Sequence, residues 1–105
     1  MTSVKFYVHS GNLSGYEVSG HSSVSASDSE GKIVCAAVSS AAIMAANTIT
    51  EIIGAKIEEN VKDGYMCIKL CSKQDECQNV LKGLRLHMNE LAMQYPNQLK
   101  VFSEV

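Results

Sequence analysis

The sequence predicts an α+β domain in which a mainly antiparallel sheet is packed by two helices, in the order β-β-α-β-β-α. Two pairs of segments alternate between apolar and polar residues and are each joined by turn residues, which is the pattern of a β-hairpin. Each pair is followed by a long segment with helical character. A chain of 105 residues is long enough for one hydrophobic core. We therefore expect residues 1–105 to form a single domain.

The first hairpin is predicted from the alternation of Val4, Phe6 and Val8 with polar residues. The stretch "SGNLSG" supplies turn residues, and Tyr16 and Val18 resume the alternation. This predicts two paired strands, the second of which ends at Gly20 and His21.

The segment after the hairpin changes character twice. Ser22 to Gly31 is almost wholly serine, glycine and acid, which predicts a mobile loop of the kind that often serves function. Ile33 to Ile53 is rich in alanine and contains no proline, which predicts a helix that ends before a capping glycine, Gly54. The small alanine side chains would let this helix approach a sheet or a second helix closely.

The second half of the chain repeats the arrangement. Ile57 to Val61 and Tyr65 to Cys71 flank Asp63 and Gly64, a strong tight-turn signal. An amphipathic helix then begins near Ser72 and Asp75, which offer a capping start. Pro96 stops it. The tail "NQLKVFSEV" either adds a short strand or packs across the sheet. The apolar face of the helix is formed by residues at three- and four-residue spacing: Cys77, Val80, Leu81, Leu84, Met88, Leu91 and Tyr95.

Composition excludes several classes of function. The formal net charge is −2 with both signs mixed along the chain, so no basic footprint for nucleic acid is present. The apolar run from Ile33 to Ala46 is shorter than the ~20 residues that a membrane span needs. The N-terminus lacks the pattern of a secretory signal, so we expect a cytoplasmic protein. The expected partners therefore include neither nucleic acid nor a membrane.

The four cysteines do not form the paired clusters of a structural zinc site, so we expect no metal and no cofactor. In a reducing cytoplasm they remain thiols. Three of them, Cys67, Cys71 and Cys77, are expected to be small buried hydrophobes.

The fourth cysteine, Cys35, has a setting that suits chemistry. The predicted helix places it in the first turn, where unpaired backbone N–H groups favour a thiolate and could bind the oxyanion of a tetrahedral intermediate. His21, at the end of a strand, carries the side chain best suited to move a proton near neutral pH. If the intervening loop folds back, the two form the nucleophile and base of a cysteine hydrolase. From the residues alone, a core thiol and a surface imidazole remain the commoner explanation.

The stretch "EVSGH", the small-residue loop and "GKIVCAAVS" together resemble the ribosomal-processing cysteine protease family, Prp, whose hallmark is G-H…G-x-D-I-V-C-A-A-V-S. The likeness covers nearly the whole chain and includes the ending "QYPNQLKV". The family's base matches His21 and its nucleophile matches Cys35.

The resemblance implies a homodimeric α+β fold and the removal of an N-terminal extension from a bacterial large-subunit ribosomal protein, the one whose N-terminus points to the peptidyl-transferase centre. It also implies an aromatic substrate residue at the cut and a gating role for the loop between base and nucleophile, which here includes Ser22, Ser23, Ser25 and Gly31.

Two features depart from the family pattern. The loop is slightly longer, and Lys32 stands where the family has an aspartate. A lysine at a helix start usually faces solvent, so we expect the supporting carboxylate to come from Asp28 or Glu30. Two other functions stay open at this point: a dimeric, non-catalytic module that binds a ribosomal protein or an assembly intermediate of the ribosome, and a redox-sensing thiol.

Overall fold

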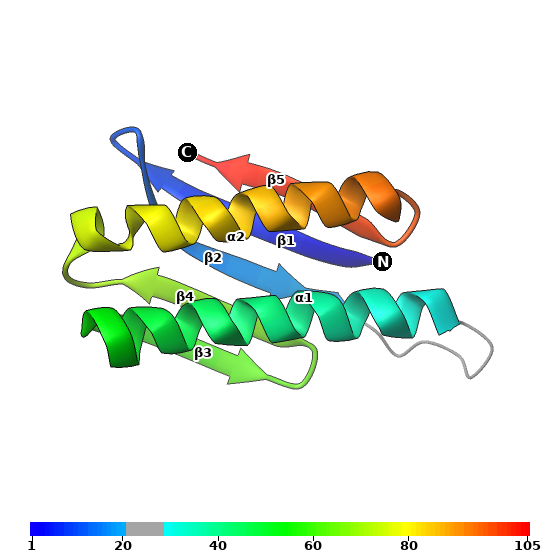
Figure 1. Cartoon of the computed structure of the whole chain (residues 1–105), viewed down its shortest axis with the longest axis horizontal. Helices are drawn as coiled ribbons and strands as arrows, with labels where there is room; N and C mark the ends of the chain where they lie inside the picture. Colours follow the sequence, from blue (N-terminus) through cyan, green and yellow to red (C-terminus); the bar gives the residue numbers. More distant parts are fainter. Residues whose placement is uncertain (21–28) are drawn as a thin grey trace.

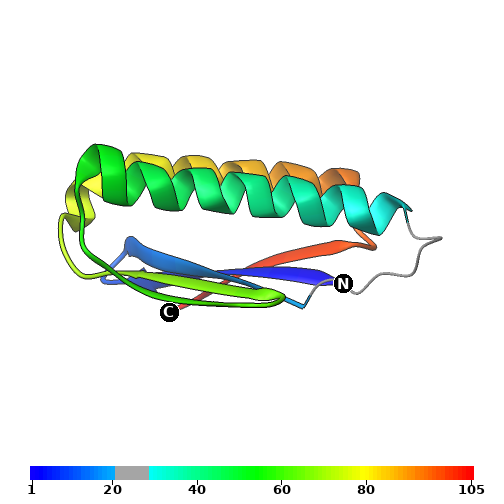
Figure 2. The same cartoon turned by 90° about the horizontal axis from the view of Figure 1, so that it is seen from below.

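The molecule has two layers, a five-stranded sheet and a pair of helices that both lie on one face of it (Figures 1 and 2). The computed structural model describes residues 1–20 and 29–105. Within the residues described, no helix lies on the other face of the sheet (Figure 2). This arrangement confirms the predicted α+β class.

The first hairpin consists of β1 (Thr2–His9) and β2 (Asn12–Ser19), which pair antiparallel. Ser10 and Gly11 connect them with φ values of 52° and 79°. Two successive residues with positive φ match the right-handed twist of the strands in a tight hairpin. The turn is therefore shorter than the predicted stretch "SGNLSG", most of which belongs to β2.

The first helix, α1 (Ser29–Asn47), continues as a π-helical segment, η1 (Thr48–Ile53). Gly54 ends it with a φ of 81°, the left-handed conformation that glycine adopts without strain, so the predicted end is confirmed. The start was predicted too late. Ser29, Glu30 and Gly31 are helical, because no proline interrupts them and an acidic residue suits the first turn of a helix.

The second hairpin pairs β3 (Ile57–Lys62) with β4 (Tyr65–Leu70), as predicted. The second helix, α2 (Gln74–Gln94), is also confirmed, but the predicted cap is wrong. Lys73 occupies the cap position with a left-handed backbone. The Ser72 hydroxyl instead accepts a hydrogen bond from the Lys56 backbone N–H at 2.8 Å, which ties the start of α2 to the segment before β3.

The tail forms a fifth strand, β5 (Leu99–Glu104), which pairs parallel to β1. The sheet order is β3-β4-β2-β1-β5, so the two strands of the first hairpin are both interior. The structure thus selects the strand from the two alternatives predicted for the tail. The sheet order also matters for the site, because β2, the strand that leads toward His21, has a paired neighbour on each side.

The core lies between the sheet and the helices. The α1 side contributes mainly small residues, whereas α2 contributes larger ones at the predicted spacing. The fully buried side chains with the largest volumes are Tyr16, Phe6, Ile49, Ile68, Leu81, Met88, Val4, Val34, Val38 and Cys77.

The segment Ser29–Ile53 is, by length and composition, apolar enough to cross a membrane, although its most apolar run was predicted to be too short. Val34, Val38 and Ala45 on this segment are nevertheless completely buried in the core. One side of the segment is therefore occupied by packing within the domain.

Candidate active site

Cys35 is the seventh residue of α1 and is partly exposed. It contributes to the wall of a cavity of about 330 Å³ that lies between α1, the end of β2 and the hairpin of β3 and β4. Val38 and Ser39, three and four residues further along the helix, line the same cavity, as the period of an α-helix requires. The thiol is thus accessible from a hollow in the surface, the setting in which a reactive cysteine is found.

The walls of this cavity are mainly apolar, and most of its polar groups other than Cys35 and Ser39 lie on the strand side. Ser19 lines it at the end of β2, and Lys62, Asp63 and Tyr65 line it from the turn between β3 and β4. Such a combination of apolar walls and few polar groups is typical of a binding site. The apolar lining residues are Val18, Val38, Ala42, Ile43, Val61 and Met66.

His21 lies outside the described residues, as do Ser22, Ser23, Ser25 and Asp28. The strand that leads to His21 is described as far as Gly20, and Ser19 is already at the cavity. Gly20 has a φ of 81°, and a Cβ at this position would lie 2.9 Å from the Met1 carbonyl oxygen. Both facts require a glycine directly before His21.

The position of Cys35 in its helix differs from the prediction. The first turn of α1 contains Glu30 and Gly31, and Gly31 is buried in the helix instead of belonging to the loop. Only the first four residues of a helix have unpaired N–H groups, and the dipole acts mainly within that turn. Cys35 lies beyond it, so its own backbone N–H is part of the helical ladder and the predicted position of Cys35 in the first turn is wrong.

The two charged residues before Cys35 are both exposed. Lys32 faces solvent, as predicted for a lysine near a helix start. Glu30 is also exposed, in the first turn.

The remaining cysteines are also free thiols. Cys67 and Cys77 are buried as predicted, and burial, with the nearby Glu76 carboxylate, raises the pKa of Cys77. Cys71 is exposed, contrary to prediction, because it directly follows the last residue of β4. No group of three or more metal-binding side chains occurs within residues 1–20 and 29–105.

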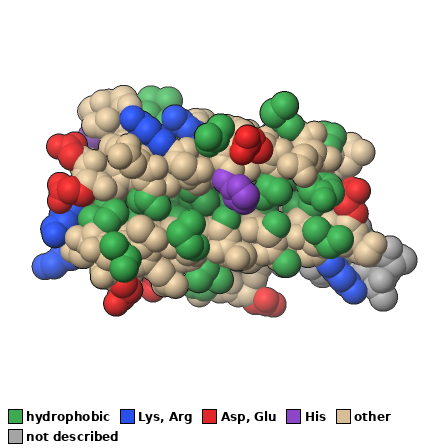
Figure 3. All heavy atoms as spheres, viewed as in Figure 1, with side chains coloured by type: hydrophobic (Ala, Val, Ile, Leu, Met, Phe, Trp, Pro, Cys, Tyr) green, Lys and Arg blue, Asp and Glu red, His purple; other side chains and the backbone are tan. Residues whose placement is uncertain are grey.

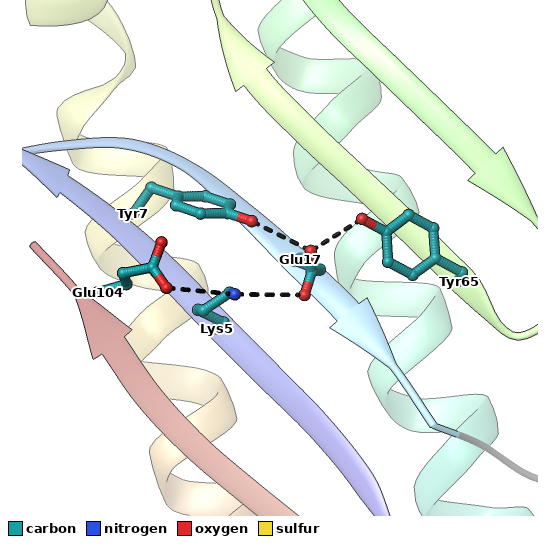
Figure 4. A network of polar contacts seen from close by, with 5 residues as sticks. All are labelled: Lys5, Tyr7, Glu17, Tyr65 and Glu104. Carbon is teal, nitrogen blue, oxygen red and sulfur yellow. Dashed lines mark hydrogen bonds and ion pairs between the residues drawn. The ribbon is translucent and has the colours of Figure 1, made fainter.

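Tyr65 connects the cavity to a polar network on the open face of the sheet (Figure 4). Its hydroxyl donates a hydrogen bond to Glu17 Oε1 at 2.8 Å, and the Tyr7 hydroxyl donates to the same oxygen at 3.0 Å. Lys5 Nζ lies 3.6 Å from Glu17 Oε2 and 3.4 Å from Glu104 Oε1. The network joins β1, β2 and β4 to one another and also reaches β5. It lies close to the end of β2.

These contacts change the titration of the groups involved. The hydrogen bond to Glu17, with partial burial, raises the pKa of Tyr65 to about 12. Burial alone would raise the pKa of Glu17, but the hydrogen bonds from Tyr65 and Tyr7 and the charge of Lys5 outweigh it and hold that pKa below its usual value. Glu17 is therefore a carboxylate at neutral pH and keeps both tyrosines in place.

Sequence reasoning missed the residues that the second hairpin brings to the cavity. Asp63 was interpreted only as a turn residue, and Lys62 and Tyr65 only as parts of strands. No local pattern places that hairpin beside α1, because the pairing of β2 with β4 brings them together.

The family to which the chain belongs follows from a comparison of its sequence. The family model described as cysteine protease Prp matches residues 1–100. The chain belongs to this family. It is therefore a cysteine protease, which confirms the resemblance noted in the sequence. No curated protein matches the chain.

Several solved structures have the same fold. The ribosomal processing protease Prp from S. aureus, in complex with a substrate peptide, superposes with a TM-score of 0.87 at 19% identity, over 99% of this chain and 100% of that chain. SMU.848 from Streptococcus mutans gives 0.85 at 26% identity, over 99% of each chain. The S. aureus enzyme has also been solved with a covalently linked product peptide, with a TM-score of 0.85 at 20% identity over 99% of this chain and 100% of that chain.

Proposed function

We propose that Cys35 is the nucleophile and His21 the general base of a cysteine endopeptidase. The observation that carries this proposal is the position of Cys35 on the wall of a mainly apolar cavity that Ser19 also lines. His21 follows Ser19 by two residues, and two residues of extended chain span at most about 7 Å. A thiol and an imidazole held at one hollow are the two groups that thiol proteolysis needs.

In this mechanism His21 accepts the proton of the Cys35 thiol, and the sulfur attacks the carbonyl carbon of the scissile peptide bond. The tetrahedral intermediate collapses when the C–N bond breaks and His21 returns the proton to the leaving amine. Water, deprotonated by His21, then attacks the thioester, and the C–S bond breaks to release the acid and the thiol. Protons and electrons balance without a metal or cofactor.

The proposed substrate is the N-terminal extension of a bacterial large-subunit ribosomal protein, cleaved in the cytoplasm. The related S. aureus enzyme is described as a ribosomal processing protease and was solved with a substrate peptide. The apolar walls of the cavity suit an aromatic or large aliphatic side chain at the cut, since burial of such a side chain favours binding.

The decisive experiment is incubation of the protein with such a ribosomal-protein precursor, followed by mass spectrometry. We expect one cleavage, and Cys35→Ala should abolish it while the fold is retained. Cys71→Ala is the matched control, because Cys71 is an exposed thiol that does not line the cavity. Tight binding of the precursor by the wild-type protein without any cleavage would instead indicate a non-catalytic binding module.

A carboxylate from Asp28 or Glu30 supports the pair in this proposal, since Lys32 replaces the family's aspartate. Lys32 is exposed, so Lys32→Ala should change the cleavage rate only mildly. Asp28→Ala or Glu30→Ala should slow cleavage without unfolding the protein. A large rate loss in Lys32→Ala, with both acidic variants unaffected, would contradict this assignment.

We further propose that two copies associate through the outer face of the helices. No charged residue occurs on α1 and η1 between Lys32 and Glu51, although a helix face that contacts water is normally charged. Ile33, Met44 and Ile52 are 57%, 58% and 80% exposed. Hydrophobic side chains gather along the line between the two helices (Figure 3).

A groove of about 710 Å³ follows this line and is lined by His87 and otherwise by small and apolar residues of α1 and α2, including Ala41, Met44 and Gly83. Small residues let two helix layers approach closely. We expect sedimentation to show a dimer at micromolar concentration, and Met44→Glu to shift it to a monomer. Met93→Glu is the control, because Met93 is 82% exposed on α2 but does not line the groove. A monomeric wild-type protein would contradict the proposal.

A further inference from the structure

Tyr16 connects the strand that leads to His21 with the helix that carries Cys35. It lies on β2, five residues before His21, and its side chain is completely buried. Its hydroxyl donates a hydrogen bond of 2.7 Å to the backbone carbonyl oxygen of Ala42 on α1. A buried tyrosine hydroxyl needs such a partner, but here the partner belongs to the neighbouring layer.

The hydrogen bond lies where α1 packs on the sheet through short side chains, which resist movement of the helix weakly. The residues of α1 that are buried near this point, Val38, Ala42 and Ala45, have short side chains. Such a surface interdigitates weakly with a sheet, so it restrains rotation and sliding of the helix less than long side chains would. A short hydrogen bond depends on both distance and angle, and therefore restrains both motions.

The geometry of the helix transmits this restraint to the thiol. Ala42 and Cys35 are seven residues apart, which is close to two full turns, so they lie on the same side of α1. Both also line the same cavity. A rotation of the helix that moved the Ala42 carbonyl away from Tyr16 would move Cys35 in the same direction.

Tyr16 is itself firmly held. Its strand pairs with β1 at Phe6 and with β4 at Ile68, and its ring lies 6.2 Å from the Phe6 ring. Burial raises the pKa of Tyr16, so the hydroxyl remains a donor over the whole range in which a cysteine protease works.

We propose that Tyr16 is a positioning residue of the active site, whose hydrogen bond to Ala42 fixes the position of α1, and with it the Cys35 thiol, relative to the end of β2. This inference rests on the proposed roles of Cys35 and His21. An error of about 1 Å in the position of a reacting group lowers a rate by about a hundredfold, so a single hydroxyl two turns from the thiol is sufficient to affect catalysis.

The test is Tyr16→Phe, which removes the hydroxyl and keeps the ring. The Ala42 carbonyl keeps its bond within the helix, so no buried group is left unpaired. We expect kcat for peptide cleavage to fall about tenfold to a hundredfold, while KM changes less than about threefold. The rate of alkylation of Cys35, followed by the mass of its peptide, should reach its midpoint at a higher pH, because the imidazole pairs less closely with the thiolate.

Two variants separate positioning from stability. Ile68→Val removes one methylene beside Tyr16 and leaves the hydrogen bond, so kcat and the alkylation profile should stay at wild-type values. Tyr7→Phe removes a hydroxyl that is bonded on the open face, and should behave in the same way.

Wild-type kcat and an unchanged alkylation profile in Tyr16→Phe would overturn the proposal. An equal loss of kcat in Ile68→Val would overturn it as well. Failure of the proposed nucleophile is a separate result, since only that failure would let Cys35→Ala cleave at the wild-type rate.

Discussion

The two faces of the sheet are stabilised by different forces. On the face covered by the helices, Val4, Phe6 and Ile68 are completely buried and the contacts are apolar. On the open face, Lys5 of β1 forms an ion pair with Glu17 of β2, and Glu17 also accepts hydrogen bonds from the hydroxyls of Tyr7 and Tyr65 (Figure 4). Apolar burial does not depend on pH, whereas a carboxylate network does.

The difference is sharpest at two consecutive residues of β2. Tyr16 points into the core and bonds to α1, and Glu17 points outward and accepts hydrogen bonds from Tyr7 and Tyr65. The strand that leads to His21 is thus held on one side by a neutral hydrogen bond and on the other by a charged network. Variants on each face should therefore respond differently to pH.

The largest effect is expected on the covered face. Leu81 of α2 is completely buried, so Leu81→Ala should lower the free energy of unfolding by about 2–5 kcal/mol through lost burial and a cavity. Urea unfolding at pH 7 and at pH 4 should give the same loss. Leu86→Ala is the control, because Leu86 is 62% exposed and should cost less than about 0.5 kcal/mol.

The next largest effect is expected at Gly15 of β2, which pairs with Tyr7 of β1 and Lys69 of β4. A Cβ at this position would collide with the Ile68 backbone carbonyl oxygen, which cannot move without disturbing the pairing of β2 with β4. Gly15→Ala should therefore lower the free energy of unfolding by about 1–3 kcal/mol. Gly83→Ala, where a Cβ meets nothing within 4 Å in one protomer, should instead stabilise the α2 of a monomer, such as the Met44→Glu background, by about 0.5–1 kcal/mol. Equal effects of the two changes in thermal unfolding would contradict this account.

Glu17→Gln tests the charged side of the comparison. Because the pKa of Glu17 is lowered in the folded protein, its contribution is present above its usual pKa of 4.5 and is lost as the pH falls through the folded value. We expect the variant to be less stable by about 1–3 kcal/mol at pH 7, with the difference shrinking below about pH 4.5. Urea unfolding across this range measures it. A difference that stays constant with pH would indicate loss of packing instead of charge.

The smallest effect is expected at the edge of the network. Glu104 is 56% exposed, so Glu104→Gln should cost less than about 0.5 kcal/mol at low salt. Concentrated salt should remove even that difference in thermal unfolding, because it screens exposed charges. A loss above about 1 kcal/mol would mean that Glu104 stabilises the open face as strongly as Glu17.

Much of the fold follows from local patterns, and each departure from prediction has an identifiable cause. Alternation predicted both hairpins, and helical spacing predicted α2, because these signals depend on neighbours along the chain. The start of α1 was predicted four residues late, because serine and glycine are typical of loops even where, as at Ser29 and Gly31, they form the first turn of a helix. The cap of α2 was mispredicted because Ser72 bonds to Lys56, a partner sixteen residues away.

The sequence by itself determined the class of fold, the family and the pair of residues proposed for catalysis, since "GH" and "GKIVCAAVS" are contiguous signals. Only the tertiary structure decided that Cys35 opens onto an apolar cavity, that Asp63 and Tyr65 share that cavity, and that the Tyr16 hydroxyl bonds to α1. These facts depend on the sheet order, in which β2 pairs with β4. Pairing between strands that are some fifty residues apart is set by the packing of the whole core, so no short stretch of sequence encodes it.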